Sequence, residues 1–278
     1  MSEIVPGEPL IEFKNVRIGF EEGEILREIS FRVWPGETKI LLGESGSGKT
    51  LIMKMAAGLL RPDEGRVWVM GEDLSAMPEK DLLDFRRHLG FVFQEGALFD
   101  SMTVAENVSF RLREESVDEA QIDSRTREVL RFVEMEPALL KYPAELSGGM
   151  RRRVSIARAL VDKPPIVFYD SPTAGLDPVT SQTIITLVMR GRDLQGVTSL
   201  LATHRVQDAF GLARFRFDKE SGRVVSRDGN GAGPRAVDEF AATNVIVLRH
   251  GGIYFQGSAE EVLQSKDSYL QKYLASAE

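Results

Sequence analysis

Residues 43–50 place the tightest constraint on what this chain can fold into. The β-prone run 38–42 precedes them and the helix-prone run 51–60 follows, so the expected context is strand, tight loop and helix. Glycines in such a loop turn backbone N–H groups towards an anion at the positive end of the helix. The stretch fits G-x-x-x-x-G-K-[ST] and reads Gly43, Glu44, Ser45, Gly46, Ser47, Gly48, Lys49 and Thr50.

The motif predicts a phosphate-binding loop. Lys49 would reach the β- and γ-phosphates of a nucleotide, and the Thr50 hydroxyl would hold Mg²⁺. The competing interpretation is a glycine-rich turn that matches the pattern by chance. Further motifs in the chain decide between the two.

The composition describes an acidic globular protein. The 278 residues are 42% hydrophobic and 28% charged, which suits about two domains or one large α/β domain with an inserted lobe. The net charge of −7 argues against nucleic acid as the main partner, because phosphate backbones are bound by electropositive surfaces. Cysteine is absent, which agrees with a reducing cytosol. No apolar run approaches the roughly 20 residues of a membrane-spanning helix, so we expect any membrane process to be served through a partner.

Two residues at expected strand ends are candidates for nucleotide contacts. Residues 10–20 and 29–34 read as strands, and Phe20 either stacks on an adenine or simply fills the core. A strand at residues 89–93 is closed by Gln94. Its amide oxygen faces Mg²⁺ or an attacking water, or Gln94 is an ordinary exposed strand end.

Two further polar residues end apolar runs that read as buried parallel strands. Asp170 closes the run 166–170, where a carboxylate is placed to hold Mg²⁺ opposite Thr50. His204 follows the run 197–203. The chain has three histidines, and we expect this one to contact a γ-phosphate.

The stretch 95–145 is amphipathic, charged and rich in helix-forming residues, so it predicts an inserted helical lobe. Ser147, Gly148 and Gly149 then precede a basic helix at residues 151–160. These three residues form either a second phosphate site at a helix N-terminus or an ordinary serine N-cap.

The last third of the chain contains an insertion and a tail. Residues 215–243 are the insertion, in which the turn at 219–222 predicts a β-hairpin and residues 228–234 predict a mobile loop. The insertion is either a tolerated surface feature or a docking element for a partner. Residues 258–278 read as a pair of helices that pack on the core or on a second subunit.

Taken together, these motifs resemble those of the ATPase subunits of ABC transporters over nearly the whole chain. The correspondence runs in chain order through Phe20 as the adenine-stacking residue, residues 43–50 as the Walker A loop, Gln94 as the Q-loop glutamine, residues 146–150 as the signature sequence with Met150 where glutamine is usual, Asp170 as the Walker B aspartate, residues 174–177 as the D-loop and His204 as the switch histidine.

The resemblance implies a fold, cofactors and a site. The fold would be an α/β P-loop NTPase core of the RecA-like ABC type, at residues 1–94 and 146–257, with an antiparallel β subdomain and a helical subdomain inserted at 95–145. The cofactors would be ATP and Mg²⁺. The implied roles are catalytic for Lys49, Gln94, Asp170, Ser171 and His204, metal-binding for Thr50, Gln94 and Asp170, and nucleotide-binding for Phe20, residues 43–50, Ser147, Gly148, Gly149 and Asp177.

The resemblance also implies partners. Two such subunits, identical or different, sandwich two ATP molecules head to tail, so that Ser147 of one contacts the nucleotide of the other. The helical lobe docks on integral-membrane permease subunits at the cytoplasmic face of the inner membrane. A narrower similarity at residues 90–104, with Asn107, Val108 and Met150, looks like the ATPase of MCE-linked, Mla-type phospholipid transporters, and it implies an MCE-domain protein as a further partner.

Ser171 departs from the family pattern. ABC ATPases usually carry glutamate directly after the Walker B aspartate, where its carboxylate polarises the attacking water. A serine hydroxyl has almost no basicity near neutral pH, and general-base help is worth roughly 10²–10⁴ in rate. We therefore expect a weakly hydrolysing subunit, the degenerate half of a heterodimer, an ATP-binding regulatory module, or an engineered or incidental change that traps ATP.

Overall fold

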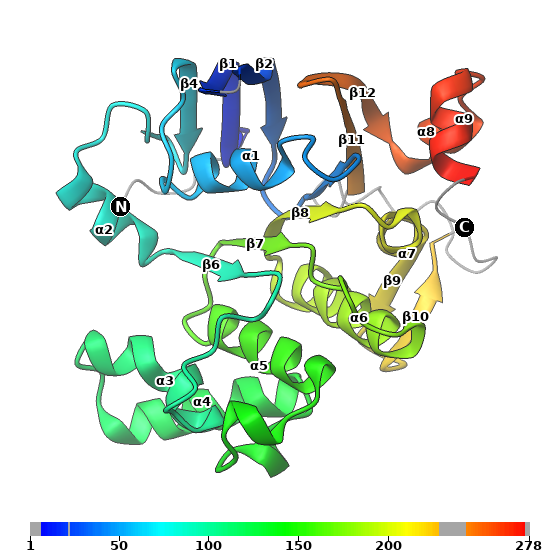
Figure 1. Cartoon of the computed structure of the whole chain (residues 1–278). Coiled ribbons are helices and arrows are strands. Elements are labelled where there is room, and N and C mark those ends of the chain that lie inside the picture. The colour runs from blue at the N-terminus through cyan, green and yellow to red at the C-terminus, as the bar shows by residue number, and fades with distance from the viewer. Residues whose placement is uncertain (1–6, 22, 228–242, 276–278) are drawn as a thin grey trace.

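The computed structural model describes residues 7–21, 23–227 and 243–275 (Figure 1). Its central sheet has the strand order β12-β11-β3-β8-β7-β6, with β11, β3, β8, β7 and β6 parallel and β12 antiparallel. The strands are β3 (Thr38–Leu42), β6 (Leu89–Val92), β7 (Ile166–Asp170), β8 (Thr198–Thr203), β11 (Thr243–Arg249) and β12 (Gly252–Ser258). The predicted P-loop α/β core is confirmed.

A second, antiparallel sheet has the order β2-β1-β4-β5. It consists of β1 (Ile11–Phe20), β2 (Gly23–Val33), β4 (Glu64–Val69) and β5 (Glu72–Asp73). The predicted start of the second strand at residue 29 is wrong, because β2 begins at Gly23. The prediction left residues 24–28, which include the charged Arg27 and Glu28, outside the strand, yet backbone pairing with β1 extends the strand through them.

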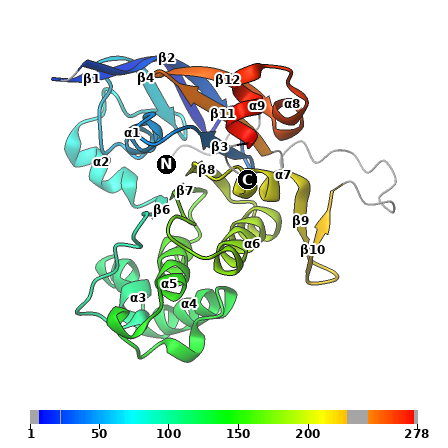
Figure 2. The same ribbon diagram turned by 45° about the vertical axis from the view of Figure 1, so that its right-hand side comes forward.

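The helices cover the central sheet on both faces (Figures 1 and 2). Helices α1 (Lys49–Ala56) and α2 (Glu79–Arg86) lie on the side of the antiparallel sheet. On the other side, α5 (Gly148–Leu160) contacts α3 (Val104–Glu114), α4 (Glu119–Phe132), α6 (Pro178–Gln195) and β6. The one-turn helices η1 (Glu136–Ala138) and η2 (Pro143–Glu145) precede α5. No helix in the described ranges is long and apolar enough to cross a membrane.

Every residue of β7 and β8 is buried, as the runs 166–170 and 197–203 predicted, and every residue of β3 is buried as well. Alternate side chains of β3 point to opposite faces of the sheet. Ile40 and Leu42 therefore join the core formed with α5 and α6, whereas Leu41 joins the core formed with α1 and the antiparallel sheet. The carboxyl edge of the sheet is thus held rigidly from both sides.

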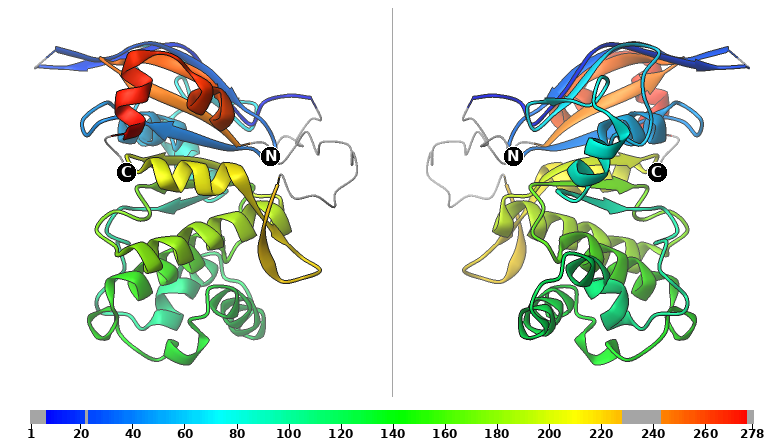
Figure 3. Two further views of the ribbon diagram at one scale, coloured as in Figure 1. Left: turned by 90° about the vertical axis from the view of Figure 1, so that its right-hand side faces the viewer. Right: turned by 90° about the vertical axis from the view of Figure 1, so that its left-hand side faces the viewer.

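The insertion and the tail take the predicted forms where the structure describes them. Helix α7 (Val206–Arg214) leads into a hairpin of β9 (Phe215–Asp218) and β10 (Arg223–Ser226), which extends beside α6 (Figure 3). The predicted loop at 228–234 lies outside the described residues. The tail folds into α8 (Ala259–Gln264) and α9 (Ser268–Ala275).

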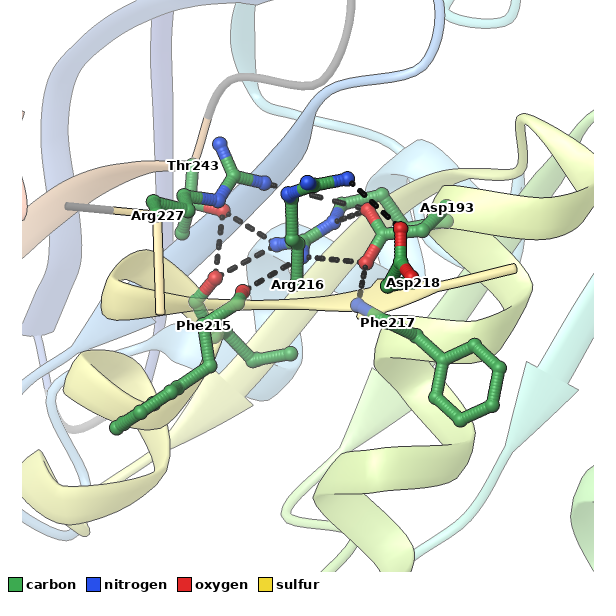
Figure 4. A network of polar contacts seen from close by, with 9 residues as sticks. Asp193, Phe215, Arg216, Phe217, Asp218, Arg227 and Thr243 are labelled. Atoms are coloured by element: carbon green, nitrogen blue, oxygen red, sulfur yellow. Dashed lines mark hydrogen bonds and ion pairs between the residues drawn. The ribbon is translucent and has the colours of Figure 1, made fainter. Parts of the chain in front are cut away.

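A buried ion pair at the end of α6 anchors the hairpin (Figure 4). Arg192, whose side chain is fully buried, donates to both carboxylate oxygens of Asp193 at 2.7 and 3.0 Å. Its guanidinium also donates to the Phe215 carbonyl and the Thr243 hydroxyl. The Phe217 N–H donates to Asp193. These contacts join α6 to β9 and to the first residue of β11.

Candidate functional site

Four loops meet at the carboxyl edge of the central sheet because the strand register aligns their starting points. Leu42 of β3 pairs with Thr203 of β8, and the neighbouring Ala202 pairs with Asp170 of β7. Val92 of β6 pairs with Tyr169 of β7. The residues that follow these strands therefore lie side by side, at the edge where α/β proteins bind ligands.

The phosphate loop needs its glycines for steric reasons. Gly48, the residue before α1, has a φ of 94°, and a Cβ there would lie 2.3 Å from a methyl carbon of the buried Leu26. A Cβ on Gly43 would lie 2.8 Å from the Leu248 carbonyl oxygen. Larger residues would displace the loop from the core packing that fixes it.

Lys49 is the first residue of α1 and is buried. Its ammonium donates to the carbonyls of Gly43 and Glu44, each at 2.8 Å, and to the Ser47 hydroxyl at 3.2 Å. Burial lowers the pKa of Lys49, and the charge of Asp170 opposes that shift. The loop thus holds a partly desolvated cation, and phosphate oxygens would be stronger partners for it than these neutral acceptors.

Thr50 and Asp170 form an oxygen pair suited to Mg²⁺. The Thr50 hydroxyl donates to Asp170 Oδ2 at 3.0 Å, although the two residues come from α1 and β7. Across the described residues, no group of three or more His, Cys, Asp and Glu side chains is placed to hold a metal. Mg²⁺ at this pair would take its other ligands from nucleotide phosphates, water and the predicted ligand Gln94, which lines the same cavity.

These elements enclose a cavity of about 860 Å³. The predicted residues that line it are Phe20, the whole loop from Gly43 to Thr50, Gln94, Ser171 and His204. Phe20 is 52% exposed, so the structure does not use it as a core residue. Residues that the sequence interpretation did not assign to this site also line the cavity: Ile25, Leu51, Ala174, Arg205, Gln207 and Tyr273.

Ser171 lines the cavity directly after Asp170. Its φ is 48°, in the left-handed region that non-glycine residues rarely adopt, and its N–H donates to the Ala202 carbonyl at 2.9 Å. Its hydroxyl donates to Asp170 Oδ1 at 3.3 Å. Among the described residues that line the cavity, Glu44 is the one with a carboxylate side chain. Strained conformations of this kind concentrate at functional sites.

The signature residues 146–150 do not line this cavity, and of the D-loop residues 174–177 Ala174 alone does. Ser147 is the N-cap of α5, where its hydroxyl accepts from the Met150 N–H at 3.3 Å. Helix α5 therefore begins at Gly148 rather than at the predicted residue 151. Asp177 is the N-cap of α6 and accepts from the N–H groups of Val179 and Thr180. The roles of Ser147, Gly148, Gly149 and Asp177 towards a partner's nucleotide stay predictions.

A buried carboxylate behind His204 had no signal in the sequence. Asp208 accepts from the hydroxyls of Thr173 and Thr203, and Arg205 lies 3.6 Å from its other oxygen. Burial raises the pKa of Asp208, against the effect of these donors. Asp208 thereby joins the loop after β7 to the last residue of β8, directly before His204.

Comparisons with known proteins identify the family of this chain. A model of the ABC transporter family matches residues 26–174. The sulfate/thiosulfate import ATP-binding protein CysA 2 of Agrobacterium fabrum is 33% identical over 270 residues, which cover 96% of this chain and 69% of that protein. The methionine import ATP-binding protein MetN of Corynebacterium diphtheriae is 36% identical, with 77% and 64% covered. The chain spans about two thirds of the length of these relatives.

A plant protein and two solved structures extend the comparison. TRIGALACTOSYLDIACYLGLYCEROL 3 of Arabidopsis thaliana is 34% identical over 276 residues, which cover 95% of this chain and 73% of that protein. The ATP-binding cassette MJ0796, in a dimeric post-hydrolysis state with ADP and Pi, aligns with a TM-score of 0.73 at 27% identity over 90% of this chain and 98% of its own. CbiO1 from Clostridium perfringens, part of the ABC transporter complex cbiONQ, aligns with a TM-score of 0.75 at 26% identity over 93% and 92%. This chain therefore belongs to the ATP-binding subunits of ABC transporters, whose cofactors are ATP and Mg²⁺.

Proposed function

We propose that this chain is a weakly hydrolysing ATPase subunit that drives an ABC transporter as a head-to-tail dimer. The observation that carries the proposal is the single cavity in which the phosphate loop, Gln94, Ser171 and His204 meet beside the Thr50–Asp170 pair. This set contains groups for holding phosphates and a metal, but serine occupies the place of the usual carboxylate.

The proposed dimer accounts for the residues that lie outside the cavity. Ser147 and Asp177 are exposed helix N-caps in this chain. A second subunit in head-to-tail orientation would bring its own Ser147, Gly148 and Gly149 to the γ-phosphate bound here. The dimeric state described for the cassette MJ0796 supports this assembly.

The chain's own residues suit in-line attack on the γ-phosphorus. Lys49 and the N–H groups at the start of α1 would stabilise charge on the phosphate oxygens. When bound at Thr50 and Asp170, Mg²⁺ would neutralise part of that charge. Gln94 and His204 line the same cavity, and in this proposal they would orient the water and the γ-phosphate. Ser171 cannot accept the water's proton near neutral pH, so we expect turnover to be slow.

Steady-state phosphate release tests this proposal. We expect slow turnover by the wild-type chain, no turnover by Lys49→Ala, and an increase on the order of 10²-fold in Ser171→Glu. Ser171→Gln is the matched control, because it has the size of glutamate without its basicity and should give no gain. Equal rates for Ser171→Glu and the wild type would refute the claim that the missing carboxylate limits hydrolysis.

The second candidate function is an ATP-binding regulatory or structural module, or the degenerate half of a heterodimer. Ser171 is the observation that favours it. In this case the wild-type chain binds ATP tightly and releases no phosphate in steady state. A partner ATPase that carries the glutamate would then restore turnover, because its catalytic site would borrow the signature residues of this chain.

We propose phospholipid as the cargo, with an MCE-domain protein and permease subunits as partners at the cytoplasmic face of the inner membrane. The stretch 90–104 and Met150 support this proposal, and one relative is named after a lipid. Other relatives are named for the import of sulfate, methionine or polyamines. ATP-dependent transfer of a fluorescent phospholipid by the co-purified complex in vesicles tests the cargo. Transfer that persists in Lys49→Ala would refute the coupling to ATP.

The division of the chain into domains is also a proposal, and it rests on the family resemblance. The ATPase core comprises residues 1–94 and 146–257, and the helical subdomain 95–145 would carry motion to the permease. Helix α5 contacts both α3 and β6, so it is placed to link the two. The insertion 215–243 is proposed as a partner-docking element. Unchanged assembly after deletion of residues 219–240 would refute that role.

A further inference from the structure

Helix α9 brings the C-terminal part of the chain to the nucleotide cavity. Tyr273 lines this cavity together with Gly43 and Glu44, which begin the phosphate loop. The side chain belongs to none of the sequence motifs and is only 9% exposed. We propose that Tyr273 is a positioning residue that forms one wall of the ATP pocket and holds the start of the phosphate loop, so that α9 sets the affinity for ATP.

The beginning of α9 is fixed by hydrogen bonds. One carboxylate oxygen of Asp267 accepts from the N–H groups of Tyr269 and Leu270, each at 2.9 Å, and the other accepts from the Tyr254 hydroxyl at 2.8 Å. Leu270 is 2% exposed within the core. Because Tyr273 follows Leu270 by three residues, it lies on the same face of the helix and is directed inward.

An aromatic stack fixes the ring of Tyr273. The ring of Tyr269 lies 6.1 Å from it, with an angle of 23° between their planes. The Arg249 guanidinium, at the end of β11, lies 3.8 Å from the Tyr269 ring centroid, within the range of a cation–π contact. The position of Tyr273 is therefore tied to the sheet as well as to its own helix.

The polar end of Tyr273 lies at the loop. Burial raises its pKa to about 12, while the backbone of Gly43 acts in the opposite direction and the charge of Glu44 adds to the rise. The phenol thus remains protonated at neutral pH. The same two loop residues supply the carbonyls that hold the Lys49 ammonium at 2.8 Å. Gly43 and Glu44 therefore lie between Tyr273 and the lysine that must turn to the phosphates.

Two variants separate the hydroxyl from the ring. This inference rests on the ATP binding in the proposed function, which titration of the wild-type chain tests by itself. Fluorescence titration with a labelled ATP analogue and Mg²⁺ measures the Kd, and phosphate release at saturating ATP measures kcat. We expect the Kd to rise about threefold in Tyr273→Phe and about tenfold in Tyr273→Ala, with kcat unchanged. Tyr142→Ala is the matched control, because Tyr142, the residue before η2, is 47% exposed and does not line the cavity.

Each other outcome overturns the inference. If both variants have the wild-type Kd for the ATP analogue, and the wild type binds it normally, Tyr273 serves only in packing. Tighter ATP binding by Tyr273→Ala would mean that Tyr273 obstructs the pocket, which is the opposite of the proposed role. A wild-type chain that binds no ATP would refute the proposed function itself. If Tyr273→Ala lowers the unfolding midpoint too far for titration, Tyr273→Phe decides the matter, because it keeps the ring and its packing.

Discussion

Substitution of Asp193 by alanine should destabilise the protein strongly, because it leaves a buried charge without its partner. The Arg192 side chain is fully buried and that of Asp193 is 9% exposed. The carboxylate accepts three hydrogen bonds, two from Arg192 and one from the Phe217 N–H. In Asp193→Ala the guanidinium would keep only neutral acceptors, such as the Phe215 carbonyl and the Thr243 hydroxyl.

The expected loss follows from the geometry of this pair. Removing one partner of a buried ion pair costs about 3–5 kcal/mol, because desolvation of the remaining charge is no longer offset. For a chain of this size each kcal/mol lowers the unfolding midpoint by about 2 °C. We therefore expect the midpoint of Asp193→Ala to fall by about 6–10 °C.

Thermal unfolding followed by circular dichroism measures this change, with Asp123→Ala as the matched control. Asp123 is 63% exposed and pairs with Arg127 four residues later on α4. Solvent screens that pair, so its loss should change the midpoint little. Equal midpoints for the two variants would refute the reasoning, since they would mean that the buried pair contributes no more than an exposed one. Proteolysis near the hairpin should also quicken in Asp193→Ala, because Phe217 loses its anchor.

Two further predictions concern the site. Thr50→Val should weaken ATP binding on the order of tenfold in the presence of Mg²⁺ and leave it unchanged in EDTA. Thr50→Ser keeps the hydroxyl and should bind ATP as the wild type does. Equal Mg²⁺ dependence in all three chains would exclude Thr50 as a ligand. Burial raises the pKa of Asp208, so its contribution to stability is fully present below the ordinary value of 3.8 and is lost as the pH rises through the raised value. Urea unfolding of Asp208→Asn across that interval should therefore show stability rising relative to the wild type with pH, and a constant difference would contradict this.

The sequence predicted the parts of the site that depend on local pattern. The phosphate loop is specified by glycine spacing over eight residues, and it forms between β3 and α1 as expected. The apolar runs of β7 and β8 identified buried parallel strands. Because parallel strands end at one edge, the residues that close them, Asp170 and His204, could be placed together without a structure.

Other parts depend on contacts between distant segments and carry no local signal. Tyr273 reads as an apolar residue on an amphipathic helix, and its place at the cavity follows from the anchoring of α9 by Asp267 and Arg249. Asp208 reads as an ordinary polar residue of α7, yet it accepts from one hydroxyl in the loop after β7 and one at the end of β8. The early start of β2 at Gly23 was not predicted, because charged side chains surround the one buried residue, Leu26, in its first half, and pairing with β1 extends the strand.

The described site separates binding from chemistry. In the proposed function, Lys49, the loop N–H groups and the Thr50–Asp170 pair would hold the phosphates and the metal. Ser171 occupies the position of the usual carboxylate, and its hydroxyl donates to Asp170. Under that proposal, ATP-dependent closure of the dimer does the work, and hydrolysis is the slow step that reopens the dimer. Ser171→Glu should then shorten the lifetime of the closed dimer without changing the ATP concentration at which it forms.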